Sequence, residues 1–390
     1  MKTSGSIELS LRKFVAPEYI FGIDARKLAA NYCKKLAAEN ILLVTDKGLQ
    51  DTPLVNELEL LLQKEGLAYT IYDAVSPNPR DYEVMKGAEV YKANKCNIIV
   101  ALGGGSVLDC AKGIGIVVTN FNDIRSFEGI DKIEKPTPPL ICIPTTAGSS
   151  ADVSQFAIIN NTQEKYKMAI ISKALVPDVS LIDPIALEFM GSYLTACTGM
   201  DALAHAFEAY VSNANSPFTD LYAIESIKLI HDNLIYTILN PENLQARGKT
   251  ALGSLYAGLA FSNASLGCVH SLAHSLGGYL DLPHGECNAI LLPHVVDYNF
   301  DSANDRYKNI AKIFNLDVEN LPLNKVKTKL VDYLIEFKKN VTIIDTLKNK
   351  GVKTDIINAL ADKAIKDPCN ATNPKAPTKT DLATIYSEAL

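Results

Sequence analysis

The chain of 390 residues has no tryptophan, no block of basic residues and no long apolar run. A net charge of −6, without basic segments interleaved with aromatics, argues against nucleic acid or an anionic membrane as the main partner. The sequence contains no run of about 18 apolar residues, the length that would predict a membrane-spanning helix. Residues 1–22 lack the apolar centre of a signal peptide. We therefore expect a cytoplasmic protein with neither nucleic acid nor membrane as its partner.

Closely spaced cysteine pairs are also missing, because none of the eight cysteines stands in a Cys-x-x-Cys arrangement. Most of them have apolar neighbours, as in ICIP and NKCNIIV. In a long chain without a secretion signal, this pattern predicts reduced and mostly buried thiols.

The first half of the chain alternates short apolar runs with stretches of helical spacing. Strands are expected at 40–46, 67–75, 97–105, 138–148 and 178–184, and helices at 53–66, 81–94 and 106–118. The runs VSQFAIINN and KYKMAIIS are typical of a hairpin. Apolar strands that alternate with helices predict a parallel sheet covered on both faces.

The second half has helical patterns almost throughout. Runs at 194–212, 218–239 and 244–280 have helical spacing, and charged amphipathic segments follow from 303 to 366. A turn cluster at 367–374 precedes a last helix. We therefore predict an N-terminal α/β domain over residues 1–187 and an all-helical domain over residues 188–390.

A glycine-rich loop lies between the third predicted strand and the helix after it. Gly103, Gly104 and Gly105 precede Ser106 there. Free N–H groups at a helix N-terminus attract anions, and glycines let the backbone approach a phosphate. The spacing is not G-x-G-x-x-G, so a plain strand-to-helix turn is the alternative. The loop 143–152 also ends an apolar strand, and open α/β sheets bind ligands at such paired loops.

Two carboxylates accompany these loops. Asp46 ends the first predicted strand, where a carboxylate accepts hydrogen bonds from a ribose 2′-OH and repels a 2′-phosphate. This position favours NAD over NADP, and it is compatible with a plain helix N-cap. Asp109 follows in the first turns of the helix after the glycines.

The chain has only six histidines, and three of them crowd between residues 270 and 284. His270 and His274 stand four apart, as do Asp201 and His205, so each pair shares one helix face. His284 lies in Leu-Pro-His-Gly, a turn signal that can return the chain past the helix.

Three imidazoles and one carboxylate together suit Zn²⁺ or Fe²⁺, and spacing does not choose between these ions. The alternative is a set of histidines satisfied by ordinary hydrogen bonds. We apply that alternative to His231 and His294, which stand alone.

These motifs resemble those of the iron-dependent (group III) alcohol dehydrogenase family over essentially the whole chain. The segments that carry the resemblance are Gly-Gly-Gly-Ser at 103–106, Pro-Thr-Thr-Ala-Gly at 144–148, Gly-Met-Asp-Ala-Leu-Ala-His at 199–205, Val-His-Ser-Leu-Ala-His at 269–274 and Leu-Pro-His-Gly at 282–285.

The resemblance implies the dehydroquinate synthase-like fold of that family. Residues 1–187 would bind a dinucleotide, and residues 188–390 would bind the metal and substrate. The implied metal ligands are Asp201, His205, His270 and His284. The expected NAD(H) contacts are Asp46, Asn78, Gly103, Gly104, Gly105, Ser106, Asp109, Thr145, Thr146 and Lys167. The expected substrate pocket contains Asp152, Phe261 and Cys369, and the candidate catalytic residue is His274.

The implied reaction is reversible hydride transfer between a small primary alcohol or aldehyde and NAD(H), with Fe²⁺ as the expected metal and Zn²⁺ as the alternative. His274 would relay a proton or only orient a ligand through a hydrogen bond. The family usually continues Thr-Ala-Gly with Thr-Gly-Ser-Glu, whereas residues 149–152 are Ser-Ser-Ala-Asp here. That departure leaves open a polyol or anionic aldehyde, for example a sulfonated one, as substrate. It also leaves open a weakly catalytic regulatory relative. A homodimer or higher homo-oligomer is expected.

Overall fold

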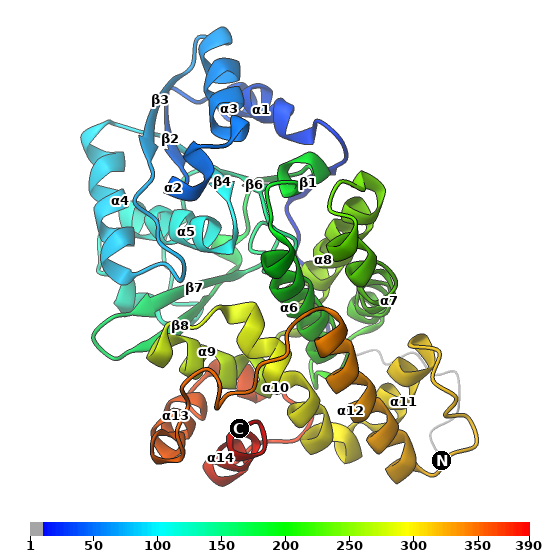
Figure 1. The fold of residues 1–390 in the computed structure, drawn as a ribbon. Helices are drawn as coiled ribbons and strands as arrows, with labels where there is room; N and C mark the ends of the chain where they lie inside the picture. Colours follow the sequence, from blue (N-terminus) through cyan, green and yellow to red (C-terminus); the bar gives the residue numbers. More distant parts are fainter. Residues whose placement is uncertain (1–10) are drawn as a thin grey trace.

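The computed structural model describes residues 11–390, and its N-terminal half is built around a six-stranded sheet (Figure 1). All strand pairs in this sheet are parallel, and the order is β1-β9-β6-β4-β2-β3. The strands are β1 (Glu18–Phe21), β2 (Asn40–Val44), β3 (Ala68–Tyr72), β4 (Ile98–Gly103), β6 (Leu140–Pro144) and β9 (Val179–Ile182). The predicted parallel sheet is confirmed, with shorter strands than expected and with β1 as an unpredicted edge strand.

Helices cover both faces of this sheet, as the unbroken apolar strands require. Alternate residues of β2 point to opposite sides: Ile41 and Leu43 pack with one set of helices, and Leu42 and Val44 pack with the other. The first set consists of α1 (Ala29–Lys35) and α3 (Pro53–Lys64). The short helix α2 (Lys47–Gln50) lies directly before α3 in the chain. The second set is α4 (Asp81–Ala93) and α5 (Gly105–Asn120).

A small second sheet contains the predicted hairpin. Strands β7 (Phe156–Asn161) and β8 (Tyr166–Ile171) pair antiparallel, and β5 (Gly129–Ile130) pairs with β8. β8 lies against helix α9 (Cys268–Leu280) of the second half. A Cβ atom added to Gly278 would lie 2.3 Å from the Tyr166 Cα atom, so the close packing requires glycine. The hairpin thus ties the two halves of the chain together.

The second half is helical, as predicted, and forms the largest core of the molecule. Besides α9, its α-helices are α6 (Ser192–Val211), α7 (Pro217–Leu239), α8 (Leu244–Ala264), α10 (His284–Asn299), α11 (Asn304–Ile313), α12 (Leu323–Asn340), α13 (Ile357–Ala364) and α14 (Lys379–Glu388). Short 3-10 helices are η1 (Ala25–Leu28), η2 (Ile124–Phe127), η3 (Lys173–Leu175), η4 (Pro184–Leu187), η5 (Phe300–Ser302), η6 (Thr354–Ile356) and η7 (Pro368–Thr372). The proposed domain boundary after residue 187 falls between β9 and α6.

The run of helical spacing over 244–280 is helical, as predicted, and it forms two helices, α8 and α9, rather than one. α8 ends at Ala264, and Ser265 has a positive φ of 60°, so the chain turns there before α9 begins. The two helices meet at a bend of 102°. After the bend, His270 of α9 lies 3.7 Å from Asp201 of α6. Among residues 11–390, no single helix is both long and apolar enough to cross a membrane. Within this range, only α8 and α9 taken together meet both the length and the hydropathy requirement, and they are bent relative to each other.

Candidate metal and cofactor site

A single large cavity of about 1000 Å³ joins the two ends of the predicted site. Asp46 and the glycine loop line one end, and all four predicted metal ligands line the other. Residues that follow β2 and β4 at their carboxyl ends line this cavity together with residues of helices α6, α9 and α10. β2 and β4 flank the point where the strand order reverses direction, which is the usual ligand crevice of an open α/β sheet.

The glycine loop brings backbone close to the cavity, as predicted. Gly104 is the N-cap of α5, whose first residue is Gly105. A Cβ atom on Gly105 would lie 2.5 Å from the Ser149 Oγ atom, and one on Gly104 would lie 3.1 Å from the Thr146 Cγ2 atom. Gly104, Gly105, Ser106, Thr145 and Thr146 line the cavity, whereas Gly103 packs against Val107 instead. The free N–H groups of the α5 N-terminus therefore face an open space, where an anion is stabilised.

Asp46 lies at the far end of the cavity, beyond the glycine loop. Its Oδ1 atom accepts a hydrogen bond from the Leu49 N–H at 3.2 Å and so caps α2. Burial raises the pKa of Asp46, although two backbone N–H groups oppose that shift. The predicted N-cap role of Asp46 is therefore present, and its contact with a ribose hydroxyl stays a prediction.

Asn78 and Lys167 occupy the middle of the cavity wall. Asn78 has a positive φ of 58°, and its N–H donates to the Ser106 Oγ atom at 3.1 Å. The Lys167 Nζ atom donates to the Asn78 Oδ1 atom at 2.6 Å. Burial lowers the pKa of Lys167. The hairpin β7–β8 thus delivers a cation to the centre of the cavity.

Asp109 faces the cavity from the second turn of α5. Burial raises its pKa to about 7, against the opposing effects of Lys112, the Ile158 N–H and Lys167. This carboxyl therefore gains and loses its proton near neutral pH.

The four predicted metal ligands converge on one oxygen atom. The Asp201 Oδ1 atom lies 3.7 Å from the Nε2 atoms of His270 and His284, and 3.9 Å from the Nε2 atom of His205. Asp201, His270 and His284 offer donor atoms that all lie within 4.8 Å of one another. Asp201 and His205 come from α6, His270 from α9, and His284 from the first position of α10. Helix α6 and the later helices α9 and α10 therefore present three imidazoles and one carboxylate to one point.

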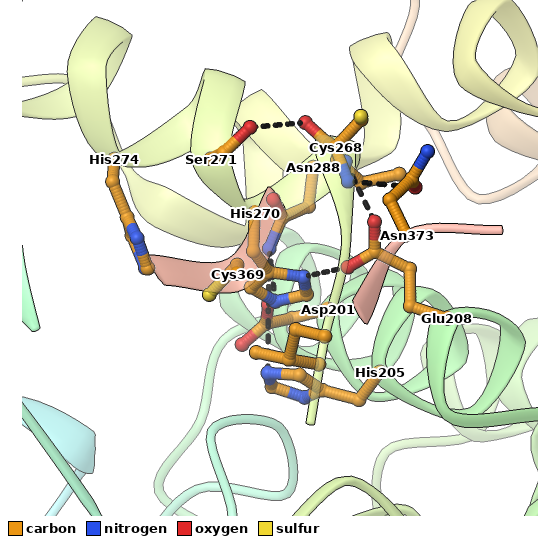
Figure 2. A network of polar contacts seen from close by, with 12 residues as sticks. Asp201, His205, Glu208, Cys268, His270, Ser271, His274, Asn288, Cys369 and Asn373 are labelled. Atoms are coloured by element: carbon orange, nitrogen blue, oxygen red, sulfur yellow. Dashed lines mark hydrogen bonds and ion pairs between the residues drawn. The ribbon is translucent and has the colours of Figure 1, made fainter. Parts of the chain in front are cut away.

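Glu208 was not predicted, and it fixes the orientation of His270. The Glu208 Oε2 atom accepts from the His270 Nδ1–H at 2.6 Å, and Oε1 accepts from the Val269 N–H at 2.6 Å (Figure 2). A proton held on Nδ1 leaves the Nε2 lone pair free for a metal. Glu208 lies one turn after His205 on α6, but its partner His270 is 62 residues away, so no local spacing revealed its role.

The charges of this cluster are arranged for a cation. Burial lowers the pKa of His205 to about 3 and that of His284 well below its usual range, despite the nearby Asp201 carboxylate. For His270 burial is opposed by Glu208 and Asp201, which raise its pKa to about 9. The carboxylates of Asp201 and Glu208 thus favour a positive charge at this end of the cavity.

The donor set fits a divalent metal ion. Two ligands placed about 2.1 Å from one ion in tetrahedral directions lie roughly 3.4 Å apart, close to the separations observed. Asn288 supplies a further test, since its Nδ2 atom lies 2.5 Å from Asp201 Oδ1 and 3.1 Å from His270 Nε2. Nδ2 also lies 3.2 Å from His284 Nε2. An N–H donor that contacts these three acceptor atoms marks the point where their lone pairs converge.

His274 lies beside the metal cluster without joining it. Its ring stacks on His284 at a centroid distance of 5.2 Å, and its Nδ1 atom lies 2.8 Å from the Asp367 Oδ2 atom. Asp367, which was not predicted, also accepts from the Cys369 N–H. His274, Asp367 and Cys369 could form a second metal group by distance. However, the hydrogen bond occupies two of the three donors, and burial raises the pKa of the Cys369 thiol.

Only one of the three predicted substrate-pocket residues lines the cavity. Phe261 does so, stacked on His205 at a centroid distance of 4.3 Å. Asp152 is buried behind its loop, where it accepts from the Ser180 Oγ atom at 2.7 Å. Cys369 is fully buried under His274 and does not reach the cavity surface. The structure does not bring Asp152 or Cys369 to the cavity wall, and their contact with a substrate stays a prediction.

The predictions for His231 and for the cysteines agree with the structure. His231 is hydrogen-bonded to Asp232 and Tyr333, far in sequence from the cluster. All eight cysteines are free and buried. The thiols therefore act as small apolar side chains.

Comparison with known proteins agrees with this geometry. Residues 16–184 match the family described as iron-containing alcohol dehydrogenase, and residues 195–390 match the family described as the C-terminal part of Fe-containing alcohol dehydrogenases. Together these matches cover most of the chain.

Individual relatives extend over almost the full length. A 1,3-propanediol dehydrogenase of Klebsiella pneumoniae is 38% identical over 95% of this chain and 96% of its own. An NAD-dependent methanol dehydrogenase of Bacillus methanolicus is 36% identical over 97% of this chain and 99% of its own. The crystal structure of a 1,3-propanediol oxidoreductase superposes with a TM-score of 0.94 at 37% identity, covering 98% of this chain and 100% of that one. By its motifs, its fold and these matches, the chain belongs to the iron-containing alcohol dehydrogenase family.

Proposed function

We propose that the protein interconverts small uncharged primary alcohols and their aldehydes, with NAD(H) as hydride carrier and one divalent metal, Fe²⁺ before Zn²⁺. The observation that carries this proposal is the position of Asp201. Its Oδ1 atom faces three imidazole Nε2 atoms at one end of a cavity whose other end reaches Asp46. NAD-dependent methanol dehydrogenase and 1,3-propanediol dehydrogenase are among the relatives, which supports this substrate class.

Asp201, His205, His270 and His284 would hold the metal, and Glu208 would keep the Nε2 atom of His270 turned toward it. A divalent ion there supplies a Lewis acid that polarises a substrate oxygen and lowers the pKa of an alcohol. The buried imidazoles of His205 and His270 help to exclude water from that point, which strengthens electrostatic interactions there.

The other end of the cavity would hold NAD(H), which takes up or gives the hydride. The N-terminus of α5 would receive the pyrophosphate, because its free N–H groups favour an anion. Asp46 would accept from the adenosine ribose and repel a 2′-phosphate. Asn78, Thr145, Thr146 and Lys167 would line the nicotinamide half of the path between these points.

His274 would move the proton that hydride transfer leaves behind. Its Nδ1 atom is engaged by Asp367, so a proton held there leaves Nε2 as the acceptor. The role that competes with this one is orientation of His284 by ring stacking. Replacement of His274 by alanine separates them, because only a relay role predicts a changed pH profile of kcat.

The cavity favours an uncharged substrate over an anionic one. Near the metal cluster its walls carry Phe156, Phe261 and Leu266. None of the described lining residues is an arginine, and the two lysines are Lys47 beside Asp46 and Lys167 bound to Asn78. Among the described lining residues, a sulfonated or other anionic aldehyde would therefore find Lys167 as its one cation away from Asp46, and the Lys167 Nζ atom is already hydrogen-bonded to Asn78.

The test is NADH-linked reduction of short aldehydes by metal-stripped protein that is reloaded with Fe²⁺ under anaerobic conditions, or with Zn²⁺. The panel includes a polyol aldehyde and a sulfonated aldehyde. We expect turnover to return with metal, to favour uncharged aldehydes, and to be absent in Asp201→Ala. Metal binding without turnover on any aldehyde would favour a regulatory relative, and absence of metal binding would contradict the proposal.

We also propose that the protein acts in the cytoplasm as a homodimer or higher homo-oligomer. The eight reduced thiols support a reducing compartment. β1 is an edge strand, and Tyr19, Phe21 and Ile23 on and beside it are 39%, 36% and 64% exposed. An apolar strand edge of this kind is suited to pairing with a second copy. Light scattering of the protein and of a Phe21→Lys variant tests this assembly.

A further inference from the structure

Two loops from opposite halves of the chain meet at the rim of the cavity, and an ion pair with two contacts joins them. Arg80 follows β3 and precedes α4, and Asp281 follows α9. The Arg80 Nη2 atom lies 2.7 Å from Asp281 Oδ2, and Nη1 lies 3.2 Å from Oδ1. Paired N–H···O bonds from one guanidinium to one carboxylate fix orientation as well as distance.

Asn78 belongs to the same connection. Its Nδ2 atom donates to Asp281 Oδ1 at 2.8 Å and to the Leu282 carbonyl oxygen at 3.4 Å. The guanidinium of Arg80 in turn donates to the Asn78 carbonyl oxygen at 2.5 Å. Asp281 is thus the common acceptor for both side chains of the loop.

The Asn78 loop is attached to the cofactor end of the cavity. The Asn78 N–H donates to Ser106 Oγ in the first turn of α5, and Asn78 Oδ1 accepts from Lys167 Nζ. A ligand that orders the α5 N-terminus therefore also orders Asn78.

Asp281 is attached to the metal end. It has a positive φ of 56° as the C-cap of α9, the helix that carries His270. Three residues later His284 opens α10, with only Leu282 and Pro283 between them. Proline fixes its own φ angle, so a short connection that contains it has few backbone conformations. A shift at one end of such a connection therefore moves the other end. Where Asp281 is held therefore limits where His284 can lie.

We propose that Arg80 and Asp281 are positioning residues that couple the two ends of the cavity, so that metal binding and NAD(H) binding strengthen each other. This inference rests on the proposed function, since it needs both ligands. Coupling between two sites is reciprocal, so the metal tightens NADH binding by the same factor by which NADH tightens metal binding.

The expected factor is modest. The side chains of Arg80 and Asp281 are 18% and 55% exposed, so water and salt weaken their attraction. We expect the metal to tighten NADH binding about fivefold at low ionic strength, and less at high ionic strength.

The test is NADH fluorescence titration of the full-length protein, metal-stripped and Zn²⁺-loaded, without substrate. The ratio of the two Kd values is the coupling factor. Arg80→Gln and Asp281→Asn are each expected to lower the coupling factor from about five in the wild type to less than about two. The double variant is expected to reduce it no further, because both changes break the same link.

Asp362→Asn is the matched control. Asp362 pairs with Lys379 at 2.6 Å, and its side chain is 56% exposed, so the variant removes a similar ion pair away from the cavity. It is expected to keep the wild-type factor. A factor of one in the wild type, or an unchanged factor in Asp281→Asn and Arg80→Gln, would overturn the inference. Failure of the wild-type protein to bind NADH and Zn²⁺ would instead contradict the proposed function.

Discussion

The two ends of the cavity are built in different ways. The cofactor end is made mainly of backbone, where the loops after β2, β4 and β6 bring N–H groups and small residues to the edge of a sheet. The metal end is made entirely of side chains, from α6 and from the neighbouring helices α9 and α10, which lie much later in the sequence. A site built from backbone depends little on any one side chain, whereas a site built from side chains depends on each of them.

The largest effect is therefore expected at Asp201, which all three imidazoles face. Asp201→Ala removes the only carboxylate of the donor set and is expected to lower turnover more than about a hundredfold, beyond the range found for groups outside the ligand set. Metal content and NADH-linked activity measure this change. The surface variant Asp297→Ala on α10 serves as control. Near-normal metal content in Asp201→Ala would show that the metal lies elsewhere.

At the cofactor end, one side chain is expected to matter despite the backbone construction, the buried carboxyl of Asp109. The pKa of Asp109 is about 7 in the folded protein, against an ordinary value of 3.8. Between these two pH values the folded protein keeps a proton that the unfolded chain releases. The contribution of this retained proton to the free energy of unfolding is fully present below pH 3.8 and is lost as pH rises through about 7. By linkage this change amounts to about 3 kcal/mol between pH 5 and pH 8.

Asp109→Asn is expected to remove that dependence, because an amide does not titrate. Urea unfolding at pH 5, 6, 7 and 8 measures the free energy of unfolding. Asp51→Asn, an exposed change at the end of α2, is expected to keep the wild-type slope. An identical slope in Asp109→Asn and wild type would mean that the carboxyl stays ionised throughout.

The same contrast explains what the sequence could reveal. Strands of continuous apolar residues and glycine loops are local signals, so the parallel sheet and its ligand edge were predictable. The i, i+4 pairs on α6 and α9 revealed candidate ligands because helix geometry is local too. The role of Glu208 was not visible, since its partner His270 lies 62 residues away. The burial of Asp152 depends on how its loop turns toward Ser180, which no local pattern encodes.

Glu208 tests whether the metal end extends beyond its ligands. Glu208→Gln keeps the size of the side chain and one acceptor, but loses the carboxylate that faces both Val269 and His270. We expect metal affinity to fall about 10- to 100-fold, as for other carboxylates that orient a ligating histidine. Competition with a chelator measures it, with Glu225→Gln on the exposed face of α7 as control. Lower stability with unchanged metal affinity would limit Glu208 to capping α9.

The smallest effect is expected at Asp46, because the rest of the cofactor end is backbone and remains in place. Asp46→Asn keeps an oxygen that can cap α2 through the Leu49 N–H, yet removes the negative charge. We expect NADPH to bind about tenfold more tightly than in the wild type, or roughly 1.4 kcal/mol, with a smaller change for NADH. Titration with both nucleotides measures the ratio. Asp73→Asn, at the same end of the cavity, distinguishes the cause. If Asp73→Asn raises NADPH affinity equally, general charge sets the cofactor preference; if it does not, Asp46 sets it by its contact with the ribose.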